Sequence, residues 1–178
     1  MIKRIGLGLI TLAVIVFLSA AIHSMTNYRV QQLILCSEPG NGFFVPAPIC
    51  RQYLITFRMG PDDIQQLQAD GGIAFVLESE LPQRFELAER FLAHGLDVNA
   101  DIRSALGERT HTPLHSAAIL NQPENLGFLL LHGADRSKLN SEGETPLQVA
   151  ERLQSQYPGE DRSVIIGTLR SAVDVATP

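Results

Sequence analysis

The residues of this sequence with the clearest chemical potential are histidines. His94 and His132 each stand directly before a glycine and lie 38 positions apart. If the segments that carry them stack, the two imidazoles could meet and bind a metal ion. A histidine at the carboxyl end of a helix is also stabilised by the helix dipole, and no carboxylate or cysteine is spaced to complete a zinc site. We therefore expect a structural role for both histidines and no metal site.

Neither the acidic pairs nor any sequence motif indicates a catalytic site. Glu78 with Glu80, and Asp62 with Asp63, are close in sequence, but nothing around them predicts a pocket, and we interpret both pairs as solvated. The sequence lacks a nucleophile elbow, a Walker loop and a zinc-protease motif. The net charge of −5 argues against a nucleic-acid partner. We expect no enzyme activity and no cofactor.

Cys36 and Cys50 are the two cysteines of the chain, and they do not form a CxxC pair. In an exported protein a disulfide between them is expected. It would close the loop from Ser37 to Ile49, which is rich in glycine and proline. A disulfide that closes a loop of this size stabilises a fold by about 3 kcal/mol, because it lowers the conformational entropy of the unfolded chain. The alternative is two free, buried cysteines.

An uncharged apolar run determines the expected compartment. It spans 18 residues, Ile5 to Ile22, and follows Lys3 and Arg4. Such a run predicts a transmembrane anchor or a signal peptide rather than a buried helix of a soluble protein. It exceeds the roughly 7–15 apolar residues of most signal peptides, which favours an uncleaved anchor. We assign residues 1–23 to this segment and expect the rest to be exported, either anchored in the inner membrane and facing the periplasm, or periplasmic if cleaved.

The most regular stretch runs from Thr112 to Asp135 and reads TPLHSAAILNQPENLGFLLLHGAD. Thr112 can cap a helix with its side-chain oxygen, and Pro113 suits the first helical position. Asn121 and Gly133 suit the left-handed backbone conformation that ends a helix. The pattern therefore predicts two helices joined by a tight turn, the second with a buried stripe of Leu126, Leu129 and Leu130.

The opening of this stretch recurs 33 residues later as Thr145-Pro146-Leu147-Gln148. The period, the TPLH opening and the glycine ending together resemble the ankyrin repeat. The resemblance implies an all-α, short ankyrin-repeat solenoid of helix-turn-helix units, in which each unit buries its apolar face against its neighbours. It covers roughly residues 61–172. A cap with the cysteine loop, residues 24–60, would precede this repeat domain, and a tail, residues 173–178, would follow it.

The first repeat has no TPLH opening. We expect a helix starting near Gly60-Pro61, an inner helix over Ile73 to Ser79 and an outer helix over Leu81 to His94. The following GLDVN resembles the ending of ankyrin repeats. The glycines that close the first two repeats, Gly95 and Gly133, lie 38 rather than 33 residues apart, so the surplus falls in the loop from Ala100 to His111.

What the resemblance implies about function is recognition of another protein. The family binds through loop tips and the exposed side of its inner helices, and it uses the histidine of TPLH, here His115, to tie down the neighbouring turn. Carried over by position, the expected partner contacts are Glu108, Arg109 and His111 in the insertion loop, Ile119 and Leu120 on one inner helix, and Ser141, Glu142, Glu144 and Arg152 around the next.

Two functions fit these features. The first is an exported protein-binding module of the immunity type, which neutralises an envelope-acting toxin or effector. Export, small size and the lack of a catalytic motif favour it, and a neighbouring gene for a secreted lipase, nuclease or peptidoglycan hydrolase would support it. The alternative is a structural or scaffolding ankyrin protein of the cell envelope that supports a membrane or stress-protection enzyme.

Overall fold

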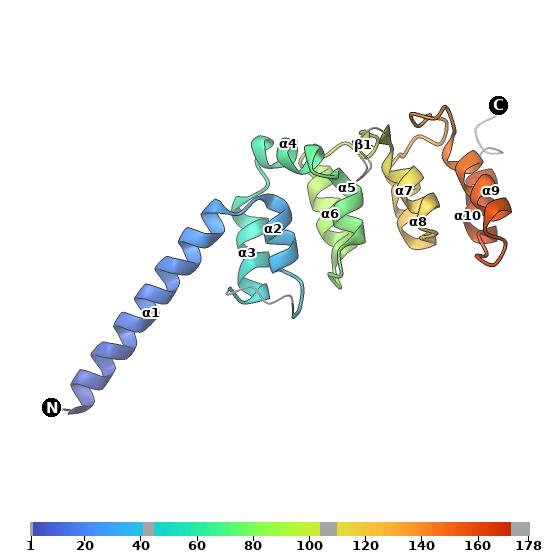
Figure 1. Cartoon of the computed structure of the whole chain (residues 1–178). Coiled ribbons are helices and arrows are strands. Elements are labelled where there is room, and N and C mark those ends of the chain that lie inside the picture. Colours follow the sequence, from blue (N-terminus) through green and yellow to red (C-terminus); the bar gives the residue numbers. More distant parts are fainter. Residues whose placement is uncertain (1, 41–44, 104–109, 172–178) are drawn as a thin grey trace.

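The computed structural model describes residues 2–40, 45–103 and 110–171. It shows a long helix followed by helical hairpins that stand side by side in a row (Figure 1). The helices are α1 (Ile2–Asn27), α2 (Val30–Cys36), α3 (Ala47–Phe57), α4 (Pro61–Ala69), α5 (Gly72–Glu78), α6 (Arg84–Ala93), α7 (Pro113–Ile119), α8 (Pro123–Leu131), α9 (Pro146–Gln156) and α10 (Ser163–Ser171).

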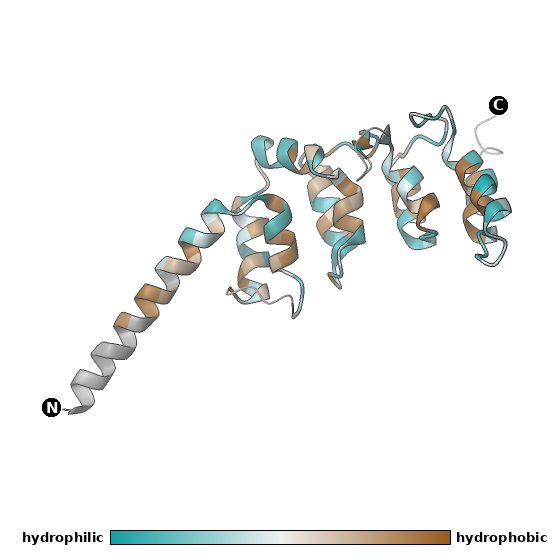
Figure 2. Cartoon of the chain, viewed as in Figure 1, coloured by the Kyte–Doolittle hydropathy of each residue, from teal (hydrophilic) through white to brown (hydrophobic). Residues whose placement is uncertain are grey.

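The first helix, α1, projects away from the row of hairpins (Figure 1) and continues past the expected boundary at residue 23 to Asn27. Its described middle part is mostly hydrophobic, whereas the hairpin helices carry both kinds of residue (Figure 2). Leu12, Ile15 and Val16 are exposed there. Over the residues that were described, no helix combines the length and apolar character needed to cross a membrane. The side chains of residues 1–11, 13 and 18, on which the anchor prediction largely rests, lie outside this description.

The carboxyl end of α1 is fastened to the array by Arg58. Its guanidinium donates to the backbone carbonyl of Tyr28 at 2.8 Å and pairs with the Asp63 carboxylate at 2.8 Å. Met25 is buried just before this point, and its carbonyl also accepts from Arg58, at 3.4 Å. A second ion pair, between Arg29 and Asp70, joins the start of the cap to the end of α4 at 3.0 Å. The direction of α1 is therefore set by contacts with α3 and α4.

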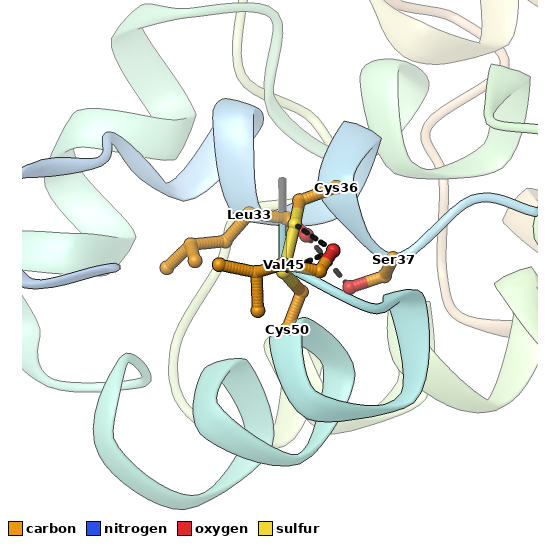
Figure 3. Close-up of a disulfide and its surroundings, with 5 residues drawn as sticks. All are labelled: Leu33, Cys36, Ser37, Val45 and Cys50. Atoms are coloured by element: carbon orange, nitrogen blue, oxygen red, sulfur yellow. Dashed lines mark hydrogen bonds between the residues drawn. A yellow bond between two sulfur atoms is a disulfide. The ribbon is translucent and has the colours of Figure 1, made fainter. Parts of the chain in front are cut away.

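The cap consists of the hairpin α2–α3, and a disulfide joins its helices (Figure 3). Cys36 and Cys50 are fully buried, and their Cα atoms lie 5.8 Å apart. Leu33 and Val45 pack around the sulfur atoms, and the Ser37 hydroxyl donates to the Leu33 carbonyl at 2.6 Å. The structure thus pairs the two cysteines as the sequence led us to expect. Residues 41–44 of the loop lie outside the described residues.

The hairpins α5–α6, α7–α8 and α9–α10 follow from caps and turns in the sequence. The hydroxyl oxygens of Thr112 and Thr145 accept hydrogen bonds from backbone N–H groups in the first turns of α7 and α9. Asn121 has a φ of 55°, and it is the one residue other than glycine with positive φ in the described chain. Gly95 and Gly133, with φ of 97° and 84°, end α6 and α8 in the left-handed conformation. The helix boundaries expected at Gly95, Thr112, Asn121, Gly133 and Thr145 are therefore present, whereas the outer helix of the first repeat begins at Arg84 and not at Leu81.

Two buried polar side chains join consecutive hairpins. The Asn125 amide on α8 donates to the carbonyl of Leu77 near the end of α5 at 3.3 Å. Arg162, only 4% exposed, donates to the carbonyls of Ala118 and Ile119 at the end of α7, at 2.7 and 3.0 Å. Helix ends leave carbonyls without intrahelical partners, and here the following part of the chain supplies the donors.

The expected apolar stripe of α8 is correct at two of its three positions. Leu126 and Leu129 are fully buried, but Leu130 is only half-buried, because it lies at the edge of the surface that α8 presents to its neighbours. In α10, Val164 is 62% exposed beside the fully buried Ile165. Phe57 is 68% exposed at the end of α3.

The insertion loop contains the main departure from an all-α fold. Residues Ile102–Arg103 and Thr110–His111 form two short antiparallel strands, β1 and β2, with Ile102 opposite His111. The pairing of the two strands satisfies backbone groups that a plain loop would leave to water. Residues 104–109, which include the predicted contacts Glu108 and Arg109, lie outside the described residues, as does the expected tail over 173–178.

Candidate partner-binding groove

His115 links one repeat to the next. Its Nδ1 accepts from the backbone N–H of Thr112 at 3.2 Å, and its Nε2 donates to the backbone carbonyl of Glu144 at 3.0 Å. Burial is the main cause that lowers the pKa of this imidazole, so the neutral form with the proton on Nε2 fits these bonds. The expected structural role, in which this histidine ties down the neighbouring turn, is what the contacts show.

The turn that His115 holds is also organised from within. The side-chain oxygen of Asn140 accepts from the backbone N–H groups of Glu142 and Glu144, both at 2.9 Å. The turn meets β2 through a reciprocal pair of bonds between Thr110 and Ser141: the Ser141 N–H donates to the Thr110 carbonyl at 2.9 Å, and the Thr110 N–H donates to the Ser141 hydroxyl at 3.1 Å. The insertion strands and the next turn therefore form one continuous edge.

A groove of about 470 Å³ lies below this edge. Its walls are α5, the two strands, the end of α7, the turn from Asn140 to Glu142, and α9. The predicted contacts that line it are His111, Ile119, Leu120, Ser141, Glu142 and Arg152. Residues predicted from three separate stretches of sequence are therefore brought together around one groove.

Arg152 and Glu144 form the fixed charge pair at one end of the groove. Two nitrogen atoms of Arg152, Nε and one terminal Nη, donate to the two carboxylate oxygens of Glu144, both at 2.8 Å. This bidentate bond lowers the pKa of the Glu144 carboxyl and raises the pKa of Arg152. Glu142 approaches the same guanidinium at 3.9 Å. Glu144, a predicted contact, thus orients Arg152 and does not itself line the groove.

His111 and Ser116 form a polar pair in the groove wall. The Nε2 atom of His111 lies 2.8 Å from the Ser116 hydroxyl oxygen. Burial is the leading cause that lowers the pKa of His111, and the nearby His115 lowers it further. Among the described residues, no carboxylate accepts a hydrogen bond from His111 to complete a catalytic triad. This arrangement fixes the side chain of His111 as a neutral polar surface.

His94 and His132 do not line the groove. Each imidazole bonds to a carbonyl one turn earlier in its own helix, His94 to Arg90 at 2.7 Å and His132 to Phe128 at 2.8 Å. Within the described residues, no three groups of the histidine, cysteine or carboxylate type are placed to hold a metal ion. Both histidines act at helix ends, as the sequence suggested.

The groove residues that were not predicted from the sequence include Phe75 and Glu78 on α5, Arg103 on β1, and Leu153 on α9. The repeat that contains α5 lacks the TPLH opening, so its inner helix could not be aligned position by position with the family pattern. The available signal was the three-residue spacing of Phe75 and Glu78, which places them on one helix face.

Comparison with known proteins agrees with this architecture. Residues 110–141, which span α7, α8 and the following turn, match the family described as "Ankyrin repeat". The chain contains an ankyrin repeat. Ankyrin repeats are protein–protein interaction modules, so a protein is the expected kind of partner.

Curated relatives match part of the chain within much larger proteins. The ARF GTPase-activating protein Git of Drosophila melanogaster is 34% identical in an alignment of 105 residues that covers 54% of this chain and 14% of that protein. The putative E3 ubiquitin-protein ligase XBAT35 of Arabidopsis thaliana is 32% identical over 88 residues, 49% of this chain and 18% of that protein. Ankyrin repeat and SOCS box protein 11 of Danio rerio is 43% identical over 54 residues, 30% of this chain and 18% of that protein. The chain therefore matches less than a fifth of each relative.

Proposed function

We propose that this ankyrin-repeat protein binds one protein partner in the groove between α5, α7 and α9. The proposal rests on two large apolar side chains that are exposed to solvent and surrounded by polar groups. Ile119 is 38% exposed and Leu120 is 51% exposed, and both line the groove beside the fixed Arg152. Exposed apolar side chains rimmed by polar groups are typical of protein-binding surfaces.

The groove is built to bind without rearrangement. His115 and Asn140 hold the turn, Arg162 holds the end of α7, and Glu144 holds Arg152. Side chains that are already ordered lose little conformational entropy when a partner arrives. This preorganisation favours specific recognition of one surface.

The location that we propose is the cell envelope, with α1 as an inner-membrane anchor and the array in the periplasm. The apolar run in the sequence supports the anchor, and the Cys36–Cys50 disulfide suits an oxidising compartment. Within this setting we favour an immunity-type role, in which the groove masks an envelope-acting effector, because the ordered walls of the groove suit recognition of a single surface.

A scaffolding role beside a membrane enzyme is the second candidate, and one observation favours it. Arg58 and Asp63 fasten the end of α1 to the array, so an anchored α1 would hold the groove at a set position relative to the membrane. A scaffold uses such a fixed position, whereas a masking protein does not need it.

The test is site-specific photocrosslinking of the full chain in its native cells. A crosslinker at Leu120 reports on the groove, and the same crosslinker at Val164, exposed on α10 and outside the groove, is the matched control. We expect one protein to be captured from Leu120 and not from Val164. Identical capture patterns, or none, would contradict the proposal. Loss of viability on deleting the chain, rescued by deleting the captured protein, supports immunity; loss of the captured enzyme's activity supports scaffolding.

A further inference from the structure

Glu78 is a groove residue whose charge has no counterpart in the described part of the chain. It is the last residue of α5 and lines the groove together with Ala74 and Phe75, which lie one turn earlier on the same helix face. No arginine or lysine of the described residues forms an ion pair with Glu78. Several glutamates elsewhere in the array do have an arginine partner, namely Glu86, Glu124, Glu144 and Glu151.

The position of Glu78 disfavours an unpaired carboxylate. The carbonyl groups at the carboxyl end of a helix carry partial negative charge, so an acidic side chain there is repelled. The protein atoms around Glu78 also displace water, and this desolvation raises the pKa of its carboxyl. The side chain nevertheless remains exposed to solvent. A local arrangement that costs stability without compensation is typical of functional positions.

The surroundings indicate what would compensate the charge. Phe75 offers an apolar surface one turn before Glu78, and Ile119 and Leu120 line the same groove. A lysine or arginine side chain matches this combination, because its aliphatic stem packs on apolar surface while its charged end reaches a carboxylate. Arg103, another groove residue outside the ion pairs of the described chain, would repel a basic side chain from β1 and so favour the α5 side.

We propose that Glu78 binds a lysine or arginine of the partner, next to an apolar partner residue that contacts Ile119 and Leu120. This inference rests on the proposed function, since it assumes that the groove binds a protein. It adds the chemistry of the partner: a surface or segment in which a basic residue adjoins an aliphatic or aromatic one.

The experiment is selection of peptides from a phage-displayed random library on the full chain in detergent micelles. Wild type, Glu78→Lys and Glu80→Lys are compared in parallel. Glu80 is the matched control, because it is exposed, lies beyond the end of α5 and does not line the groove, while its substitution makes the same change in net charge. Glu78→Gln, which removes the charge and keeps the shape, guards against loss of folding, and Leu120→Asp reports whether capture uses the groove.

We expect wild type and Glu80→Lys to select peptides in which lysine or arginine adjoins an apolar residue. Glu78→Lys should lose that preference, and the best basic peptide should bind it at least about tenfold more weakly, with a smaller loss for Glu78→Gln. Unchanged basic enrichment on Glu78→Lys overturns the assignment of Glu78. If Leu120→Asp still abolishes capture in that case, the groove function stands. Capture that survives Leu120→Asp, or no selection on any variant, contradicts both proposals.

Discussion

Replacing His115 tests the link that holds the groove edge. His115 is fully buried. Its imidazole accepts a hydrogen bond from the backbone N–H of Thr112 and donates one to the backbone carbonyl of Glu144. In His115→Ala the buried N–H of Thr112 loses its acceptor, and the carbonyl of Glu144 keeps only the hydrogen bond from the backbone N–H of Asn140. An orphaned buried polar group costs about 1–3 kcal/mol, and a small cavity adds to that cost. We expect the free energy of unfolding to fall by about 3 kcal/mol.

A milder variant separates the two bonds of His115. Gln148 occupies the equivalent position in the next repeat, and its side-chain oxygen accepts from the Thr145 N–H at 2.8 Å. His115→Gln should therefore keep the hydrogen bond to the Thr112 N–H and lose the one to the Glu144 carbonyl. We expect the free energy of unfolding to fall by about 1 kcal/mol.

We also expect a change in how the stability of the protein depends on pH. The folded state lowers the pKa of His115 and of His111, whereas an unfolded histidine titrates near about pH 6.5. The stabilisation is therefore fully present above about pH 6.5 and is lost as the pH falls through the folded-state pKa values, because the unfolded chain binds the protons first. His115→Gln should lose stability less steeply below this pH, since only the contribution of His111 remains.

Urea unfolding followed by circular dichroism from pH 5 to pH 8 measures both effects. A His115→Ala loss of less than about 1 kcal/mol, as expected for an exposed residue, would refute the structural role. An unchanged pH slope in His115→Gln would refute the pKa argument.

Two further predictions concern the core and the cap. Leu129→Ala should lower the free energy of unfolding by about 2–5 kcal/mol, and half-buried Leu130→Ala clearly less; equal losses in denaturant unfolding would mean that the burial of α8 is wrong. The purified protein should have a mass two hydrogens below its reduced form, and reducing the Cys36–Cys50 bond should lower the free energy of unfolding by about 3 kcal/mol; two free thiols, or no change in stability on reduction, would contradict the disulfide.

The sequence predicted the repeats best where local chemistry and period agree. Thr112, Asn121 and Gly133 each mark a helix boundary through a backbone preference, and all three occur where expected. Exact burial was harder, because periodicity gives a helix face but not the edge of its contact area. Leu130 and Val164 lie at such edges, and only the packing of neighbouring hairpins determines how much of each side chain is covered.

Only some of the groove residues could be predicted from the sequence. Ile119, Leu120 and Arg152 could be placed by their distance from a TPLH-type opening, and they line the groove. Glu78 and Phe75 belong to a repeat without that opening, so their position had to come from the structure. The pairing of β1 with β2 depends on the path of the inserted residues through space, and neither repeat period nor helix propensity contains that information.

The donors that cross from hairpin to hairpin have a consequence for engineering. Ankyrin repeats are attractive units for exchange between proteins, since each is a self-contained length of chain. Here the end of α7, which presents Ile119 to the groove, depends on the guanidinium of Arg162 from the following repeat. A chimera that replaced the last repeat without retaining this arginine would leave buried carbonyls unsatisfied and alter a binding surface it had not touched. The unit that can be transplanted is therefore a repeat together with the buried donor of its successor.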